Sequence, residues 1–527
     1  MNDTSIRIPP ACCHLLDEVP LRFPFWRYYE LYRGEAYSFL LDSAKQSGRL
    51  GRYSFIGGEP TLVYRVKRQK GHPPSAGANI EVIELTDSYG RQLEQPITTH
   101  RIALPFDDLR QLLAAHRVDY RQYADHPVPF LSGAAGYIGY EAGYFVEELP
   151  DAGADDLDLP DIYLMFCSTI LGHCHSSGRT YLSILGRGED EKAARRQAEM
   201  QREKLLSRIA GFESIATSEK GTRPHPSPLP KGEGTDGIFP KVEGTYEPDI
   251  SGQFDQADYC RKIETIKEHI SAGDVYQVCL TRRIDAPLVG GTAWDLYEEL
   301  RRINPAPFAS FLNFPEVQVV SSSPERFLSL GPDGIAESRP IKGTRPRGAS
   351  PEEDRRLRRE LADSPKDRAE NLMIVDLVRN DFGRVCEFRS VEVPEFMLIE
   401  DYATVFQMVS TIRGRLAARR DALDLVRACF PGGSMTGAPK IEAMKIIDRL
   451  EPVKRGIYSG AIGYLDFAGP MDLSIVIRTI VIKDGRCYFH VGGGIVADSD
   501  PQAEFQETQD KALALIEALK ILKARGP

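Results

Sequence analysis

Alternating apolar runs that end in tight turns, set beside separate helical stretches, restrict most strongly the folds open to this chain. The run VQVVSSSPERFLSL (317–330) and the run GIAESRPIKG (334–343) predict two strands joined by the turn GPDG. Strands joined by so short a turn pair antiparallel. Helical patterns cover 259–272, before Gly273, and 366–385. The chain is therefore predicted to have an α+β fold on antiparallel sheet rather than a parallel wound sheet.

The stretch TSEKGTRPHPSPLPKGEGTDGIFPKVEGTYEP (217–248) divides the chain. It is rich in Pro, Gly and charge and has too few apolar residues to fold alone, which predicts a flexible insert. A docking strip for a proline-binding partner is a less favoured interpretation. We predict an N-terminal subdomain over 1–215 that ends in a charged helix near 189–209, an insert over 216–250, and a second domain over 251–527.

Charge and cysteine content exclude several classes of function. The net charge of −10 and the pI near 5.6 argue against nucleic acid as the main partner, because phosphate binding needs a basic face. No apolar run reaches the ~18 residues that a membrane span needs. The start MNDTSIRIPP lacks the layout of a signal peptide. Nine scattered cysteines are typical of reduced thiols, so we expect a cytoplasmic protein.

One lysine stands among three arginines in SRPIKGTRPRG (338–348). Arg339, Arg345 and Arg347 stay charged, whereas Lys342 can lose its proton. The stretch has two interpretations. It is either a basic surface turn, or a site where the arginines receive an anion and lower the pKa of the lysine, which leaves a usable nucleophile. The stretch alone does not decide between them.

Two helical stretches carry acids three residues apart, Asp367 with Glu370 and Glu504 with Glu507. Residues at i and i+3 share a helix face, so each stretch presents an acidic pair on one side. Carboxylates without nearby His or Cys favour Mg²⁺ over zinc or iron. The alternative is a solvated acidic face, which is the common reason for such pairs.

Two glycine-rich stretches allow close backbone approach to a ligand. FPGGSMTGAPK (430–440) begins like a phosphate loop but has Ala and Pro where Lys and Ser or Thr belong, so a nucleotide site is rejected. Gly492, Gly493 and Gly494 are predicted to form a loop between a strand and a long helix that ends near Leu522. Their N–H groups suit a carboxylate, although such glycines are as often simple turns.

Eight blocks occur in one order between 253 and 522: GDVYQVCLTRR, SSSPERFL, RPIKGTRPRG, DRAENLMIVDLVRND, FPGGSMTGAPK, GIYSGAIGY, IRT and GGGIVADSDPQAEFQET. Together they resemble the chorismate-utilising enzymes, and most of all the members that form 4-amino-4-deoxychorismate. The first half is similar more loosely, through LLDSA and GRYSFIG. The resemblance implies two large antiparallel sheets sandwiching helices. It also implies that 1–215 is similar to the N-terminal part of anthranilate synthase component I. The segment 251–527 is then expected to be the chorismate-binding catalytic domain.

The resemblance also implies a set of site residues. Lys342 falls on the nucleophile and Glu325 on the general acid, although Glu325 read alone is a strand-end residue paired with Arg326. The implied substrate contacts are Gly343, Thr344, Tyr458, Arg478, Gly492, Gly493, Gly494 and Lys511. The implied Mg²⁺ ligands are Glu370 and Glu507, with Asp367 and Glu504 close behind. Ser43, Arg52, Tyr53, Pro307 and Phe308 resemble a tryptophan pocket, and a packing role for them is equally open.

The implied reaction replaces the ring hydroxyl of chorismate by an amino group. Anthranilate-forming relatives have alanine in place of Lys342, and water-adding relatives have lysine in place of Gln277. Gln407 stands where many relatives have histidine, so an acid–base role there is in doubt. No glutamine-hydrolysing motif is visible, so the ammonia is expected either from free ammonium or from a separate glutamine amidotransferase subunit in a heterodimer. The alternatives are an anthranilate-forming enzyme and a non-catalytic subunit that binds chorismate.

Overall fold

The computed structural model describes residues 11–45, 50–118, 127–218, 251–252, 255–402 and 405–525. The predicted charged helix is present as α2 (Glu191–Ser218) and extends beyond its expected end. The rest of the predicted insert, 219–250, lies outside the described residues, so its flexibility stays a prediction.

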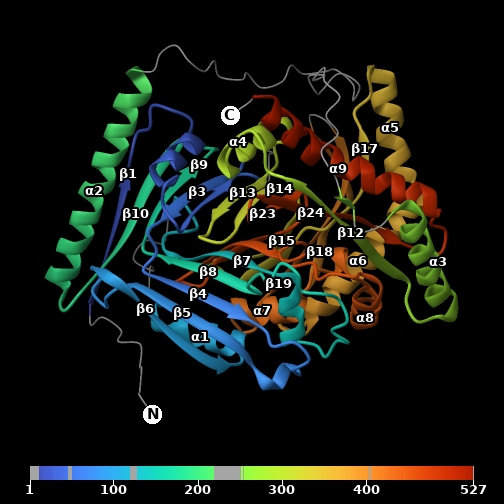
Figure 1. The fold of residues 1–527 in the computed structure, drawn as a ribbon, viewed down its shortest axis with the longest axis horizontal. Helices are drawn as coiled ribbons and strands as arrows, with labels where there is room; N and C mark the ends of the chain where they lie inside the picture. The colour runs from blue at the N-terminus through green and yellow to red at the C-terminus, as the bar shows by residue number, and fades with distance from the viewer. Residues whose placement is uncertain are drawn as a thin grey trace.

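Two twelve-stranded sheets organise the described part of the chain (Figure 1). The first has the order β1 (Ala11–Glu18), β10 (Arg179–Gly188), β9 (Thr169–Cys174), β3 (Tyr53–Gly58), β2 (Ser38–Asp42), β13 (Phe308–Asn313), β14 (Gln318–Ser323), β23 (Thr479–Lys483), β24 (Arg486–Ile495), β12 (Gln277–Pro287) and β11 (Ser251–Gly252), with β20 (Gly437–Ala438) beside β12. The second has the order β17 (Ile341–Pro346), β19 (Val405–Arg415), β16 (Ile335–Ser338), β15 (Arg326–Leu330), β22 (Met471–Ile475), β21 (Ala461–Asp466), β7 (Gly133–Ile138), β8 (Ile162–Cys167), β4 (Leu62–Lys67), β5 (Ala78–Thr86) and β6 (Gln92–Ala103), with β18 (Glu392–Asp401) beside β19.

Neighbouring strands in both sheets pair antiparallel, for example β12 with β24 and β7 with β21. The predicted α+β class and the pair of large antiparallel sheets are therefore confirmed. Each sheet takes strands from both halves of the chain, because β2 pairs with β13 in the first and β7 with β21 in the second. The division into 1–215, 216–250 and 251–527 stays a prediction about sequence segments, and both outer segments contribute to both sheets.

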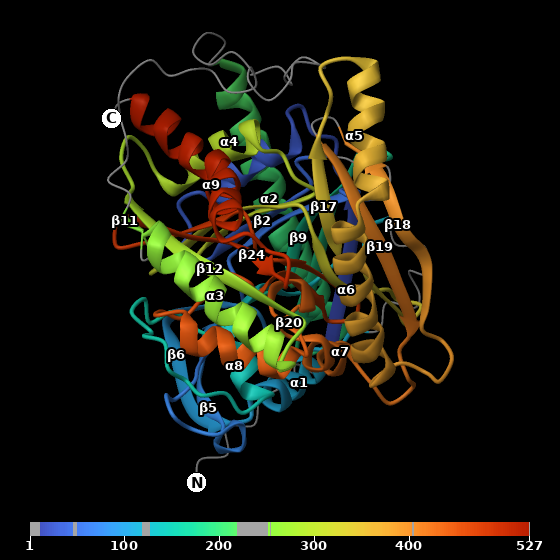
Figure 2. The same cartoon turned by 90° about the vertical axis from the view of Figure 1, so that its right-hand side faces the viewer.

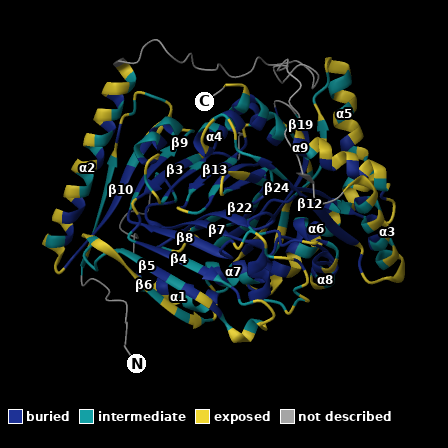
Figure 3. Ribbon diagram, in the orientation of Figure 1, coloured by how far each residue is buried: buried dark blue, intermediate teal, exposed yellow. Residues whose placement is uncertain are grey.

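The sheets pack on one another through a core rich in aromatic side chains. Phe39, Leu312 and Val319 of the first sheet share this core with Val63, Tyr137 and Tyr464 of the second. Alternate residues of the same strands point to the opposite face, as the two-residue period of a strand requires. Figure 3 shows the resulting dark-blue interior of buried strands, with exposed residues concentrated on the outer helices.

Helices cover the outer faces and also enter between the sheets. They are α1 (Pro105–Ala115), α2, α3 (Gln256–Ala272), α4 (Ala293–Ile303), α5 (Pro351–Asp363), α6 (Pro365–Gly383), α7 (Ala422–Cys429), α8 (Lys440–Leu450) and α9 (Pro501–Ala524). α2, α4 and α9 pack on the first sheet, whereas α5 and α6 follow β17–β19 of the second (Figure 2). α6 also contacts β20 of the first sheet, so this helix lies between the two sheets.

Two expected strands and one expected loop differ from the sequence prediction. The run 317–330 is interrupted at Pro324–Glu325 and forms β14 in the first sheet and β15 in the second. Pro324 has no N–H for a strand ladder, so the chain changes sheets there. The run 334–343 is likewise divided into β16 and β17 at Arg339–Pro340. Gly492–Gly494 lie within β24 and pair with β12, so the expected glycine loop is part of a strand.

The helices α6 and α9 begin in the same way. Ser364 caps the first N–H groups of α6, and Asp500 does so for α9, each followed by proline in the first turn. Asp367 and Glu504 lie in these first turns, where a carboxylate is stabilised by the helix dipole. α3 ends as predicted at a left-handed Gly273. None of the described helices is long and apolar enough to span a bilayer, and all nine cysteines are free.

Candidate active site

Lys342 lies at an irregularity in β17, where the pairing with β19 shifts between Ile341 and Thr344. The next residue, Gly343, has a φ of +84°. A Cβ on Gly343 would lie 2.9 Å from the carboxyl carbon of Asp367. Only glycine fits such a backbone at that distance. The half-buried Lys342 is therefore presented beside the first turn of α6.

The three arginines around Lys342 each have carboxylate partners within the protein. Arg339 lies 2.7 Å from Glu400, and Arg345 lies 3.0 Å from both Glu360 and Asp367. Arg347 forms a two-bond contact with Asp354. Guanidinium groups neutralised in this way are not free to receive an anion. The interpretation in which they receive an anion therefore loses support.

Lys342 instead faces acids. Its ammonium group is among the influences that hold down the pKa values of Glu325, Glu370 and Glu507. These three carboxyls come from a strand crossover and two different helices, and the charge of Lys342 acts on all of them. The predicted nucleophile, general acid and Mg²⁺ ligands thus share one region.

Glu325 lies where the chain passes from β14 to β15, and it is almost completely buried. Burial raises the pKa of its carboxyl to about 7, against the opposing effects of Lys342 and of a 3.1 Å hydrogen bond donated by Ser434. A narrow cavity lined by Glu325, Ser434 and Asp381 lies beside it. Arg326 pairs with Asp472 and Glu337, which excludes the simple Glu325–Arg326 pair. Glu325 is thus a buried acid that gains and loses its proton near neutral pH.

The four acids predicted to bind Mg²⁺ each contact a cation of the protein itself. Asp367 pairs with Arg345, and Glu507 lies 2.5 Å from Lys511. Lys366 lies 3.4 Å from Glu504 and 4.0 Å from Glu370. No group of three or more His, Cys, Asp or Glu side chains with metal-binding geometry occurs in the described ranges. The metal assignment stays a prediction.

The first turns of α9 lie against the backbone of β24. A Cβ on Gly493 would lie 2.9 Å from a carboxylate oxygen of Glu504 and 3.9 Å from one of Glu507. Ser499 donates a 2.7 Å hydrogen bond to Glu504, and this holds the buried carboxylate in place. The glycine strand and the second acidic pair therefore form one wall of the site.

Lys511 and Arg478 add positive charge at the same wall. The Lys511 ammonium donates to the carbonyl of Gly492 at 2.8 Å, and Arg478 donates to the Lys511 carbonyl at 2.5 Å. Arg478 has a left-handed φ of +52°, a strained backbone that is typical of functional positions. Within the described ranges it makes no ion pair. Its guanidinium therefore remains available for an anionic ligand.

Two further predicted substrate contacts are Tyr458 and Thr344. Tyr458 is buried and its ring stacks on His490 of β24 at 5.0 Å. Thr344 is exposed and lies opposite Gln407 in the β17–β19 register. Gln407 thus neighbours the Lys342 segment, where its amide is able to hydrogen-bond but not to exchange a proton at neutral pH.

We expect Gly494→Ala to impair both stability and ligand binding. A Cβ there would lie 2.0 Å from the amide nitrogen of Gln277, which is buried and cannot swing into solvent. Overpacking of this kind costs about 1–3 kcal/mol. Chemical denaturation should show the loss, and ligand binding at the glycine strand should weaken with it. Gly34→Ala, at a position with open space around it, is the control for the added methyl group. Unchanged stability of Gly494→Ala would contradict the close packing.

The predicted tryptophan-pocket residues are partly brought together. Ser43 donates a 2.6 Å hydrogen bond to the carbonyl of Tyr53 and a 3.3 Å bond to that of Pro307. Arg52 lies over the ring of Tyr53, whereas the ring of Phe308 faces Arg326. These contacts account for packing, and the binding of tryptophan stays a prediction.

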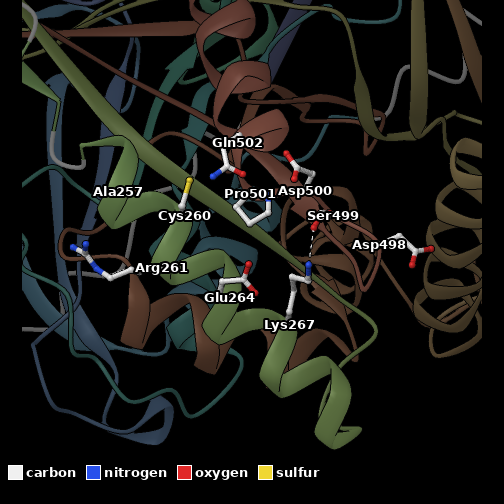
Figure 4. A pocket seen from close by; sticks show the side chains of 10 residues that line it. All are labelled: Ala257, Cys260, Arg261, Glu264, Lys267, Asp498, Ser499, Asp500, Pro501 and Gln502. Atoms are coloured by element: carbon white, nitrogen blue, oxygen red, sulfur yellow. Dashed lines mark hydrogen bonds between the residues drawn. The ribbon is translucent and has the colours of Figure 1, made fainter.

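A cavity of about 600 Å³ lies beside the start of α9, and none of the predicted site residues line it. It is lined by α3 and the start of α9 (Figure 4). Lys267 donates to the carbonyl of Ser499 across it. Its lining includes Cys260, Arg261, Glu264 and Asp500.

Sequence reasoning missed three residues that contact the site. Ser434 lies in the FPGGSMTGAPK block and bonds Glu325, and Ser499 lies before α9 and bonds Glu504. Both blocks were recognised, but nothing in the sequence indicates which serine meets which acid. Lys366 precedes Asp367 directly, and its bridge to the other helix depends on tertiary packing.

Comparisons with known proteins show the family to which the chain belongs. The family model for chorismate binding enzymes matches residues 91–517. The chain therefore belongs to the chorismate-binding enzyme family. It is 40% identical over 93% of its length to the aminodeoxychorismate synthase of Streptomyces griseus, of which it spans only 62%. It is 41% identical over 75% of its length to aminodeoxychorismate synthase component 1 of Klebsiella aerogenes, covering 79% of that protein.

A solved structure of an anthranilate synthase component I shares the fold. The crystal structure of anthranilate synthase component I from Streptococcus pneumoniae superposes with a TM-score of 0.66 and 29% identity. The match covers 88% of this chain and 92% of that one. The resemblance that the eight sequence blocks carry is thus confirmed at the level of family and fold.

Proposed function

We propose that this protein converts chorismate and ammonia to 4-amino-4-deoxychorismate, a step toward p-aminobenzoate and folate. The observation that carries the proposal is the close approach of Gly343, the residue after Lys342, to Asp367 at the start of α6. The charge of Lys342 also acts on Glu325, Glu370 and Glu507. An amine beside a buried acid suits a two-step displacement. Aminodeoxychorismate synthases among the similar proteins support the same choice of product.

In the first displacement the ammonium of Lys342 gives its proton to solvent, and the resulting amine attacks the ring carbon next to the ring carboxylate. The double bonds shift, and the ring hydroxyl departs as water with the proton of Glu325. In the second displacement ammonia attacks the carbon that lost the hydroxyl, and the lysine amine is released. The attacking ammonia loses one proton, which returns to the ionised Glu325 for the next turnover.

Other residues of the wall would orient the substrate. Arg478 and Lys511 carry positive charge beside Gly492–Gly494, and this matches the two carboxylates of chorismate. Tyr458 is stacked rigidly on His490 and limits the position of the ring. These contacts hold the reacting carbon near Lys342, an orientation effect that contributes strongly to rate.

A magnesium ion fits the acids of α6 and α9. Glu370 and Glu507 would hold it, with Asp367 and Glu504 next to them, and the ammonium of Lys366 already occupies a cation position between Glu370 and Glu504. Oxygen donors of this kind suit Mg²⁺. When bound, the ion would neutralise a carboxylate of chorismate and fix its orientation.

The ammonia would come from a separate glutamine amidotransferase subunit in a heterodimer. The name "component 1" of the Klebsiella relative supports a second subunit there. A cytoplasmic location also stays a proposal. The alternative product is anthranilate, which the Streptococcus homologue supports as a second candidate.

A product assay tests the function directly. The purified chain would be incubated with chorismate, Mg²⁺ and ammonium, and the product identified by mass and by conversion with aminodeoxychorismate lyase. Formation of 4-amino-4-deoxychorismate supports the proposal. Fluorescent anthranilate as the main product, without an aminated intermediate that keeps the pyruvyl ether, would overturn it.

We expect a descending limb near pH 7 in the profile of kcat/KM. Burial raises the pKa of Glu325 from an ordinary value to about 7, so its proton is present below that pH and is lost above it. The rate should fall about tenfold per pH unit on the alkaline side. Glu325→Gln should lower the rate and remove this limb. A limb that persists in Glu325→Gln would assign the titration to another group.

A further inference from the structure

Three cations of the protein neutralise the acids of the proposed metal site, but they differ in their other contacts. Arg345 also bonds Glu360, and Lys511 also bonds the carbonyl of Gly492. Within the described part of the chain, the ammonium of Lys366 contacts carboxylates alone, Glu504 at 3.4 Å and Glu370 at 4.0 Å. Arg345 and Lys511 thus each make a contact outside the acids of the proposed metal site, whereas Lys366 makes none among the residues that the structure describes.

Lys366 also joins the two helices that carry the acids. It lies in the first turn of α6, directly before Asp367, and reaches across to Glu504 in the first turn of α9. Its side chain is 52% exposed, whereas those of Glu504 and Glu370 are 4% and 14% exposed. A half-exposed lysine on a flexible stem is able to move into solvent, but the two buried carboxylates are not.

We propose that Lys366 is an exchangeable counter-cation, which neutralises Glu370 and Glu504 while the metal site is empty and moves into solvent when Mg²⁺ binds. The inference rests on the proposed function, because it requires that these acids bind Mg²⁺. It goes further by giving the protein a built-in competitor that sets its magnesium affinity.

The electrostatics of the pair lead to this exchange. Glu370 and Glu504 carry like charges and repel each other. Burial raises the pKa of Glu370, and the repulsion by Glu504 adds to this effect. An ammonium between them relieves the repulsion. A divalent cation does so more strongly, because the interaction energy scales with the product of the charges. The ammonium and the ion cannot occupy the same place, so binding one releases the other.

The test is calorimetric titration of the full chain with MgCl₂ in the absence of chorismate. Lys366→Met removes the competitor and keeps a good helix former. Since exposed ion pairs contribute about 0.2–1 kcal/mol, Lys366→Met should bind Mg²⁺ up to about fivefold more tightly than the unmodified chain. Its melting temperature without Mg²⁺ should fall, and the rise on adding Mg²⁺ should be larger.

Two control variants keep the result specific. Lys366→Arg retains the charge and should bind Mg²⁺ like the unmodified chain. Arg368→Gln removes a positive charge two residues away that bonds the carbonyl of Ala362, and it should leave the affinity unchanged. Equal tightening in Arg368→Gln would indicate a general charge effect and overturn the exchange.

The remaining outcomes separate the two proposals. If the unmodified chain binds Mg²⁺ and Lys366→Met binds it equally or more weakly, Lys366 is not a competitor and the inference is wrong. If neither the unmodified chain nor Lys366→Met binds Mg²⁺, the metal assignment itself is wrong and the exchange falls with it. Product formation from chorismate, measured separately, still tests the proposed reaction.

Discussion

Lys342→Ala should lower the formation of 4-amino-4-deoxychorismate by about 10³-fold or more, the order of loss that follows removal of a covalent nucleophile. Glu325 and the acids of α6 and α9 remain in place, so chorismate should still bind. Ammonia then meets the ring carbon that the lysine used to attack, and some anthranilate or its aminated precursor should appear. Product analysis by mass, with rates for each product, measures both effects.

The same variant should alter the pH profile. Lys342 opposes the effect of burial on Glu325, so its removal should raise the pKa of that carboxyl above about 7. The descending limb of any residual activity should move to higher pH. Lys342→Arg restores a positive charge but supplies no neutral amine, so it should correct the pH shift and not the rate. Near-normal synthesis by Lys342→Arg would show that the lysine acts only through its charge.

Glu370→Gln should lower turnover by roughly 10²-fold or more, because charge neutralisation by a metal contributes several kcal/mol in the transition state. Burial raises the pKa of Glu370, so the ionised carboxylate lowers the free energy of unfolding. The amide removes that charge and keeps the shape, so the melting temperature should be equal or higher. Initial rates over a series of Mg²⁺ concentrations, with thermal unfolding, measure both quantities.

Asp376→Asn is the matched control for Glu370→Gln. It lies on the same helix, its side chain is 75% exposed, and its ion pair is with Arg379 on the surface. We expect unchanged turnover and unchanged Mg²⁺ dependence. Full activity of Glu370→Gln at limiting Mg²⁺ would remove this carboxylate from the metal site.

The helices could be predicted more accurately than the strands. α3 ends at Gly273 and α6 follows its apolar spacing, because helix caps and periodicity are local signals. The run 317–330 alternates like one strand but forms two, in different sheets. Alternation gives the face of each residue, not the partner of the strand. The crossover at Pro324 depends on which strands meet there, and these come from distant parts of the chain.

For the site, the type of residue could be predicted and its partner could not. The acids at i and i+3 and the isolated lysine were recognisable from spacing and chemistry alone. Of the two interpretations of the arginines, anion binding loses support, because Glu360, Asp354 and Glu400 pair with them from segments that the local pattern does not include. Ion pairs between distant segments are fixed by tertiary packing, and a local charge count omits them.

The interleaving of the two halves has a consequence for the order of synthesis. β7 is translated early, but its partner β21 follows roughly 300 residues later, and β2 waits in the same way for β13. At about 5–20 residues per second, a ribosome needs tens of seconds to bridge the longer interval. For that time the nascent chain carries unpaired, apolar strand edges of the kind that recruit other chains. To avoid aggregation, the nascent chain must therefore keep those edges covered until their partners are made, first β13 and then β21.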